Sequence, residues 1–283
     1  MTDTAVTSLL VVSRVLHYGS ALVLFGYVFF MGFLLPQESR NRRGLVSFAV
    51  IVFVASSVLW LMAEAANAGD GLQDAIHPSV IWSVLTETSF GQVFGLQLVP
   101  GIFMVLALPA GQTRMLALFS ALALIALAPL GHAVTLGGLL LPMTQAIHLL
   151  AGGFWIGGLA AILLKPSRMD NDWRTALMHF STIGHAAVAL VILSGITLGW
   201  VLLISQPGPW NRTYVTLLVV KAALVIVMAG FAIYNRYALV PRFSKSPEAQ
   251  VQLMRVVRLN LGLAAIVILL VSLLGQLSPS IDQ

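Results

Sequence analysis

Two histidines stand close together in an almost wholly apolar part of the sequence. His132 lies in a Gly-His-Ala triplet, and His148 opens the stretch His-Leu-Leu-Ala-Gly-Gly-Phe-Trp-Ile-Gly-Gly, which ends at Gly158. An ionisable side chain inside a membrane is costly and usually has a function and a partner. The two residues therefore indicate a functional site at a helix–loop–helix junction.

The residue types restrict the chemistry of such a site. The chain contains no cysteine, so a metal site must use His, Met, carboxylate or backbone ligands. A set of His and Met ligands suits Cu(I), whereas added carboxylate or water ligands would admit Cu(II), and zinc remains an alternative. There is no phosphate-binding GxxxxGK[ST] motif and no recognisable Ser/His/Asp grouping. We therefore predict neither nucleotide binding nor enzymatic activity.

The composition is that of a membrane protein. Of 283 residues, 59% are hydrophobic and only 9% are charged, and the mean hydropathy is +0.95. A soluble domain carries far more charge on its surface. The apolar runs also exceed the roughly ten residues of a membrane β-strand, so we predict an all-α polytopic fold. The net charge of +5 comes from basic residues in short loops, so no nucleic-acid partner is expected.

Eight apolar segments approach the roughly 20 residues that cross a bilayer. They cover residues 6–35, 44–66, 92–108, 114–131, 143–164, 177–205, 213–240 and 254–277. We expect one transmembrane domain over residues 1–283. Residues 67–91 form its long external segment, in which residues 76–85 are predicted to lie along the membrane interface as a short helix.

Loop charge predicts the orientation. Most of the 15 Lys and Arg residues lie on one side of the predicted membrane. They are Arg40, Arg42 and Arg43 after the first span, Arg114 between the third and fourth, Lys165, Arg168 and Arg174 after the fifth, and Arg236, Arg242, Lys245, Arg255 and Arg258 around the loop between the seventh and eighth. The opposite side carries acids: Glu64, Asp70, Asp74 and Glu87. The positive-inside rule then places both termini in the periplasm.

Two parts of the chain have similar features. His17 is followed by Gly26, a Leu-Leu-Pro sequence and a basic loop, and His148 is followed by Gly157, a Leu-Leu-Lys-Pro sequence and a basic loop. This pattern suggests a parallel repeat of four helices plus four, with the two histidines as symmetry mates. Gly153 and Gly157 also have the spacing that permits a close helix approach.

Six polar or thioether side chains fall at or near the outer half of the predicted bundle, given a rise of about 1.5 Å per residue. They are His17, Glu64, His132, Met143, His148 and Lys221. The alternative for each histidine is a structural role, as a packed or helix-capping residue. Glu64 and Lys221 would then pair with each other or lie at the membrane surface. His185 lies nearer the inner face of the membrane, and a role on the exit side of a transport path stays open for it.

Several motifs resemble the CopD/PcoD family of bacterial copper-resistance inner-membrane proteins. They are Arg14-x-x-His17, Gly131-His132-Ala133, His148-x6-Trp155-x-Gly157-Gly158-Leu159, Phe180-Ser181 with Ser194-Gly195, and Lys221 with Asn235-Arg236 and Pro241. The resemblance implies eight helices and copper passage or handling at the inner membrane. It also implies a periplasmic CopC-type copper-binding partner.

The sequence departs from the family pattern at three positions. Gln145 stands where the family often has an aspartate, three residues before the histidine of the fifth span. Gln97 replaces an often basic residue, and Asn260 replaces an often acidic one. These departures leave proton coupling and a carboxylate partner for His148 open.

From the resemblance we expect a copper site facing the periplasm, with Cu(I) favoured over Cu(II). His148, His132 and His17 would be ligands, and Met143 and Glu64 would lie where copper enters. Lys221 would tune the site electrostatically or pair with Glu64. The supporting residues are Arg14, Trp155 and His185.

Two other functions remain open at this point. The first is a membrane redox protein that binds haem b between facing histidines, such as His17 with His148, or either with His185. The second is an assembly partner that transports nothing and docks periplasmic copper proteins through the acidic external segment.

Overall fold

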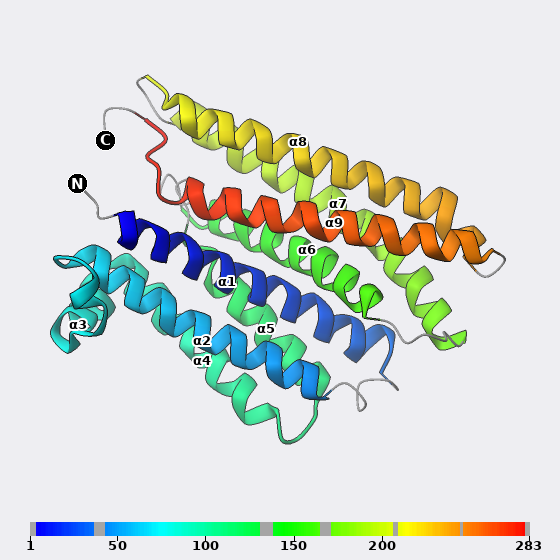
Figure 1. Ribbon diagram of the computed structural model, residues 1–283, viewed down its shortest axis with the longest axis horizontal. Helices are drawn as coiled ribbons and strands as arrows, with labels where there is room; N and C mark the ends of the chain where they lie inside the picture. The colour runs from blue at the N-terminus through cyan, green and yellow to red at the C-terminus, as the bar shows by residue number, and fades with distance from the viewer. Residues whose placement is uncertain are drawn as a thin grey trace.

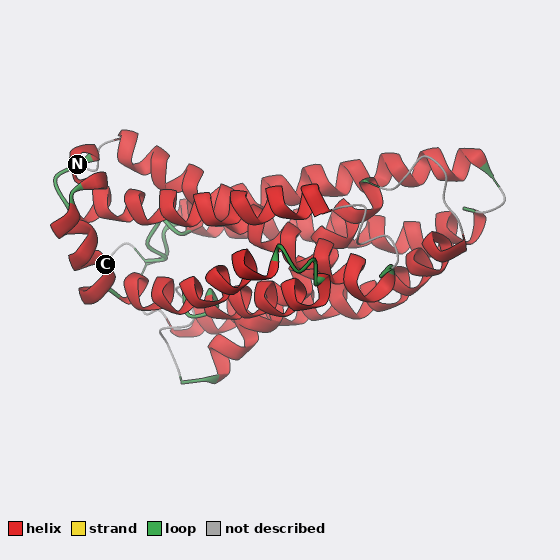
Figure 2. Ribbon diagram, turned by 90° about the horizontal axis from the view of Figure 1, so that it is seen from below, coloured by secondary structure: helices red, strands yellow, loops and turns green. Residues whose placement is uncertain are grey.

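The computed structural model describes residues 4–36, 43–130, 138–164, 171–205, 209–243 and 246–280. In these ranges the chain forms a bundle of helices and no strand, which confirms the all-α class (Figure 2). The helices are α1 (Thr4–Phe29), α2 (Arg43–Ala68), α3 (Pro78–Glu87), α4 (Ser89–Ala107), α5 (Thr113–Ala126), α6 (Leu140–Leu163), α7 (Asn171–Ser205), α8 (Arg212–Tyr234) and α9 (Pro247–Leu274). Short π-helical turns, Phe30–Leu34 and Asn235–Leu239, extend α1 and α8.

The long helices agree with most of the predicted spans. In the described ranges, seven helices are long and apolar enough to cross a membrane. The predicted fourth span, residues 114–131, corresponds to α5, which has only 14 residues and is shorter than a typical span. The short helix predicted at residues 76–85 corresponds to α3.

Side-chain caps mark where three helices begin. Thr88 Oγ1 accepts a hydrogen bond of 3.0 Å from the Gly91 N–H at the start of α4. Asn211 accepts one of 3.0 Å from the Thr213 N–H at the start of α8. Ser246 caps α9 in the same way, and each cap satisfies a backbone donor that the first helical turn leaves free. The caps thereby define where α4, α8 and α9 begin.

Helices α1 and α6 lie side by side in the middle of the bundle (Figure 1). Helix α1 also packs against α2, α5 and α9, and α6 also packs against α7, α5 and α9. Helix α4 packs on α5, as α8 packs on α9. The two parts of the chain thus place their helices alike, in the arrangement expected of a repeat of four helices plus four.

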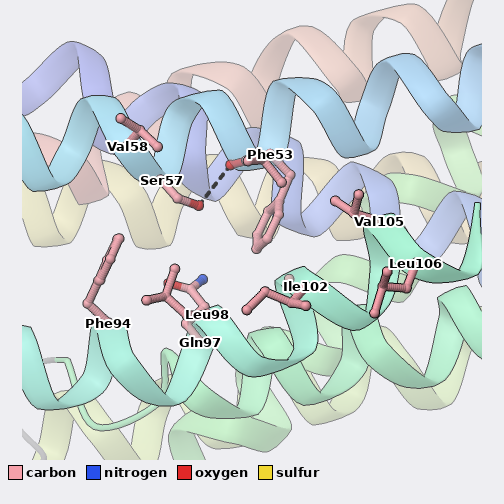
Figure 3. A pocket seen from close by; sticks show the side chains of 11 residues that line it. Phe53, Ser57, Val58, Phe94, Gln97, Leu98, Ile102, Val105 and Leu106 are labelled. Atoms are coloured by element: carbon pink, nitrogen blue, oxygen red, sulfur yellow. Dashed lines mark hydrogen bonds between the residues drawn. The ribbon is translucent and has the colours of Figure 1, made fainter.

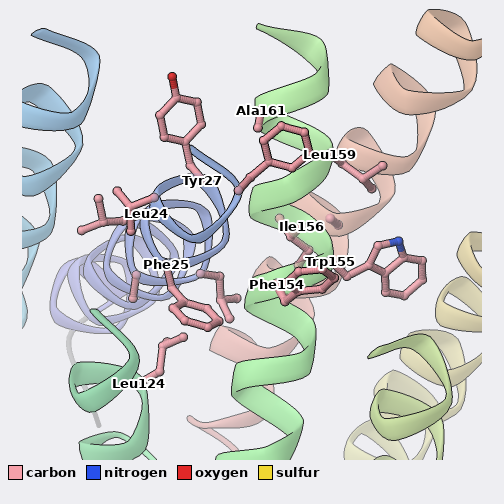
Figure 4. Close-up of a cluster of buried hydrophobic side chains, with 14 of the residues drawn as sticks. Leu24, Phe25, Tyr27, Leu124, Phe154, Trp155, Ile156, Leu159 and Ala161 are labelled. Atoms are coloured by element: carbon pink, nitrogen blue, oxygen red, sulfur yellow. The ribbon is translucent and has the colours of Figure 1, made fainter. Parts of the chain in front are cut away.

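Glycines allow the backbones of α1 and α6 to touch. A Cβ atom added at Gly26 would lie 2.8 Å from Gly157 Cα and closer still to the Gly153 carbonyl oxygen. A Cβ atom at Gly157 would lie 2.5 Å from Gly26 Cα. Phe25 of α1 and Phe154 of α6 are buried in the hydrophobic cluster around this contact (Figure 4). This is the close crossing of small residues that helices use inside membranes.

We predict that Gly26→Ala destabilises the bundle, because the new methyl group meets backbone atoms that cannot turn away. Overpacking of this kind costs about 1–3 kcal/mol. Gly19→Ala on the same helix is the control, since a Cβ atom there has no neighbour within 4 Å. Thermal unfolding of both variants in detergent checks the prediction, and equal midpoints would contradict it.

Candidate functional site

His17 of α1 is completely buried and is held by side chains of two other helices. Its Nδ1 atom lies 3.2 Å from Ser56 Oγ and 3.3 Å from Ser57 Oγ, both on α2. Both hydroxyl groups donate to the Phe53 carbonyl oxygen, so their oxygens accept the proton of Nδ1. The Gln97 amide nitrogen of α4 lies 2.7 Å from Nε2 and donates to it. Both ring nitrogens are thus hydrogen-bonded.

His148 of α6 is half-buried and has a different environment. Its Nδ1 atom lies 2.9 Å from Ser194 Oγ on α7, and the Ser194 hydroxyl donates to the Leu190 carbonyl oxygen. The serine oxygen therefore accepts the proton of Nδ1. The Val191 backbone also hydrogen-bonds to the ring, and no side chain of the described residues bonds to Nε2. A metal-binding histidine has this arrangement, with one nitrogen held by a neighbour and the other free.

The two histidines occupy matching places in the two halves of the chain. Each lies on the first helix of its half and is bonded through Nδ1 to a serine of the next transmembrane helix. The following transmembrane helix supplies Gln97 in the first half. In the second half it supplies Lys221, which interacts electrostatically with His148. The two halves thus hold their histidine in the same way through Nδ1 but differ in the third polar residue, which is Gln97 in the first half and Lys221 in the second.

Glu64 pairs with Arg14 and not with Lys221. Arg14 Nη2 lies 3.1 Å from Glu64 Oε1, and Trp60 Nε1 donates to the same oxygen at 2.9 Å. Arg14 also donates to the Gly275 carbonyl oxygen at 2.8 Å, so the cluster joins α1, α2 and the end of α9. The alternative in which Lys221 pairs with Glu64 is therefore wrong, and an electrostatic role of Lys221 beside His148 stays a prediction.

The other predicted site residues are dispersed. Met143 is 61% exposed near the start of α6, Trp155 is buried in the same helix, and His132 lies outside the described residues. His185 Nδ1 donates to the Ser181 carbonyl oxygen at 2.8 Å, while its Nε2 atom is buried without a partner. No hydrogen bond or ring contact joins His17 to His148 in the ranges that the structure describes.

The sequence interpretation missed the serines that hold the histidines. Ser56 and Ser57 form an adjacent pair inside the apolar stretch Val-Ala-Ser-Ser-Val, and Ser194 stands alone in a similar setting. Hydroxyl groups at membrane depth commonly bond across helices, so these positions carried a usable signal.

Comparison with known proteins identifies the family. Residues 1–143 match the family model described as "Copper resistance protein D-like, N-terminal domain", and residues 174–274 match the model described as "Copper resistance protein D". The chain belongs to the copper resistance protein D family. No solved structure matches it.

Relatives within the family cover most of the chain. The inner membrane protein YebZ of Escherichia coli K12 is 30% identical over 94% of this chain and 97% of its own length. Copper resistance protein D of Pseudomonas syringae pv. tomato is 26% identical over 94% and 95%. The copper transport protein CutJ of Bacillus subtilis 168 is 28% identical over 80% of this chain and 46% of its own length. This chain is accordingly a multi-pass inner-membrane protein with a copper-related function.

We predict that Glu64→Gln lowers stability by about 1–3 kcal/mol, because the variant removes a charged hydrogen-bond acceptor from Arg14 and Trp60. Glu87→Gln is the control, since Glu87 is exposed on α3 and bonds only to Ser83. The measurement is thermal unfolding in detergent. Equal unfolding midpoints for the two variants would show that the Arg14–Glu64 pair does not stabilise the protein.

Proposed function

We propose that this protein passes copper through the inner membrane by way of His148. The observation that carries the proposal is the geometry of that side chain. Ser194 fixes its tautomer through Nδ1, and Nε2 is left free to bind a metal. Imidazole nitrogen and thioether sulfur suit Cu(I), and the chain has no cysteine to compete with them. Membership of a copper resistance family supports copper as the cargo.

The path begins at the periplasmic end of α6. Met143 is exposed there, five residues before His148, which corresponds to a rise of about 7.5 Å. Its thioether receives the ion, and His132, in the segment preceding α6, completes the ligand set around His148. The basic loops support this orientation, with both termini in the periplasm.

Lys221 makes His148 suitable for passage instead of storage. Its positive charge near His148 opposes a bound cation and so favours release of the ion toward the inner side. His185 lies nine residues from Ser194 along α7, a rise of roughly 13 Å toward the basic end. Its Nε2 atom has no partner, and it receives the ion on the exit side.

The external segment is the surface on which a periplasmic CopC-type protein would deliver copper. It covers residues 67–91 and contains the short helix Leu72–Ile76 and α3. It carries the carboxylates Asp70, Asp74 and Glu87, and Ile76 and Trp82 are largely exposed beside them. An acidic rim around apolar side chains fits a partner protein better than it fits bilayer lipid.

We expect purified protein loaded with Cu(I) to retain copper, and His148→Ala to lose it. His179→Ala is the matched control, since His179 is exposed on α7. Elemental analysis for copper and iron together is the measurement. Iron without copper would overturn the copper proposal and favour a haem bundle.

Ser194→Ala tests the support of the ligand separately. The variant leaves His148 in place but removes the acceptor that fixes its ring, so affinity for Cu(I) should fall about 10- to 100-fold. Thr197→Ala, one turn further along α7, should bind as the wild type does, because its hydroxyl bonds only to its own helix. Competition with a Cu(I) chelator measures both affinities. Unchanged Cu(I) affinity in Ser194→Ala would show that Ser194 does not support the metal ligand.

A further inference from the structure

An apolar groove separates α2 from α4, away from the proposed copper path. Its volume is about 220 Å³. Phe53 and Ser57 of α2 face Phe94, Gln97 and Ile102 of α4 across it (Figure 3). The groove therefore opens beside the polar network of His17, which the copper proposal does not use.

The floor of the groove presents one unused hydrogen-bond acceptor. Gln97 is only 4% exposed, and its amide nitrogen donates a hydrogen bond to Nε2 of His17. Its amide oxygen has no partner among the described residues. A ligand that donates a hydrogen bond to this free acceptor at the groove would gain free energy. Ser57 offers no further donor, because its hydroxyl proton goes to the Phe53 carbonyl oxygen.

The remaining lining restricts the chemistry of a ligand. Among the described residues no Lys, Arg, Asp or Glu lines the groove, so a phosphate headgroup or a metal ion has no counter-charge from them. Phe53 and Phe94 offer aromatic surfaces for a flat ring. The volume is below that of most drug-sized pockets, so it suits a single ring better than a two-chain lipid.

The outer rim of the groove faces the bilayer. Val58, Ile102 and Leu106 line it and are 51%, 57% and 67% exposed in a chain whose long helices cross a membrane. A ligand therefore reaches the groove from the lipid phase and keeps an apolar tail there.

We propose that this groove binds a quinol-type ligand, a neutral ring that carries hydroxyl groups and an apolar tail. One hydroxyl group donates to the Gln97 amide oxygen, and the ring packs on Phe53 and Phe94. The site is independent of His148, so its failure would leave the copper proposal untouched.

The test compares two probes with the same tail, decylbenzene-1,4-diol and decylbenzene. Each is distributed, under reducing conditions, between nanodiscs that hold the full chain and empty nanodiscs. We expect saturable binding of the diol above the lipid background, and weaker binding of decylbenzene. Gln97→Leu should weaken diol binding about three- to tenfold and leave decylbenzene unchanged. Equal affinity for both probes would show an acyl-chain groove only and would overturn the proposal.

A second pair of variants keeps the test valid if Gln97→Leu does not fold. Gly101 lines the groove, and a Cβ atom there meets only Phe53 Cε1, at 3.7 Å. Gly101→Leu should fill the groove and abolish saturable diol binding. Gly95→Leu lies on the same helix in open space and should bind as the wild type does. Copper retention should be unchanged in both, and diol binding that survives Gly101→Leu would exclude this groove.

Discussion

The backbone contact between α1 and α6 determines the rest of the architecture. Gly26 meets Gly153 and Gly157 so closely that a side chain at Gly26 or Gly157 would collide with backbone atoms of the other helix. Inside a membrane, such packing replaces the hydrophobic effect as the force that joins helices. Because α1 carries His17 and α6 carries His148, this contact places both histidine-bearing helices at the centre. Helices α2 and α7 then flank the pair and supply the serines.

The two halves of the chain hold a histidine in the same way but surround it with different polar groups. Each holds a histidine through Nδ1 with a serine, which satisfies one ring nitrogen inside an apolar bundle. The third group then decides the role of Nε2. Gln97 donates to Nε2 of His17, whereas Lys221 influences His148 by charge and no side chain of the described residues bonds to its Nε2 atom. The two histidines therefore differ in the polar group that the third transmembrane helix of each half brings near them.

Much of this could be predicted from sequence. Long apolar runs identified the helices, and the motifs around His17 and His148 identified the family. Depth along a helix also follows from the sequence, but the direction in which a side chain points around the helix does not. For this reason the sequence allows Lys221 to pair with Glu64, whereas in the structure Glu64 pairs with Arg14. Arg14 lies on a different helix from Glu64 and was considered only beside its own neighbour His17. The groove beside Gln97 could not be foreseen either, because it depends on how far α2 and α4 separate.

The most direct test of the account is uptake of Cu(I) by proteoliposomes that contain the full chain. The account predicts saturable uptake by the wild type and by His179→Ala. It predicts uptake at the level of empty liposomes for His148→Ala, because that variant lacks the nitrogen that receives the ion. Wild-type uptake by His148→Ala would contradict the central claim.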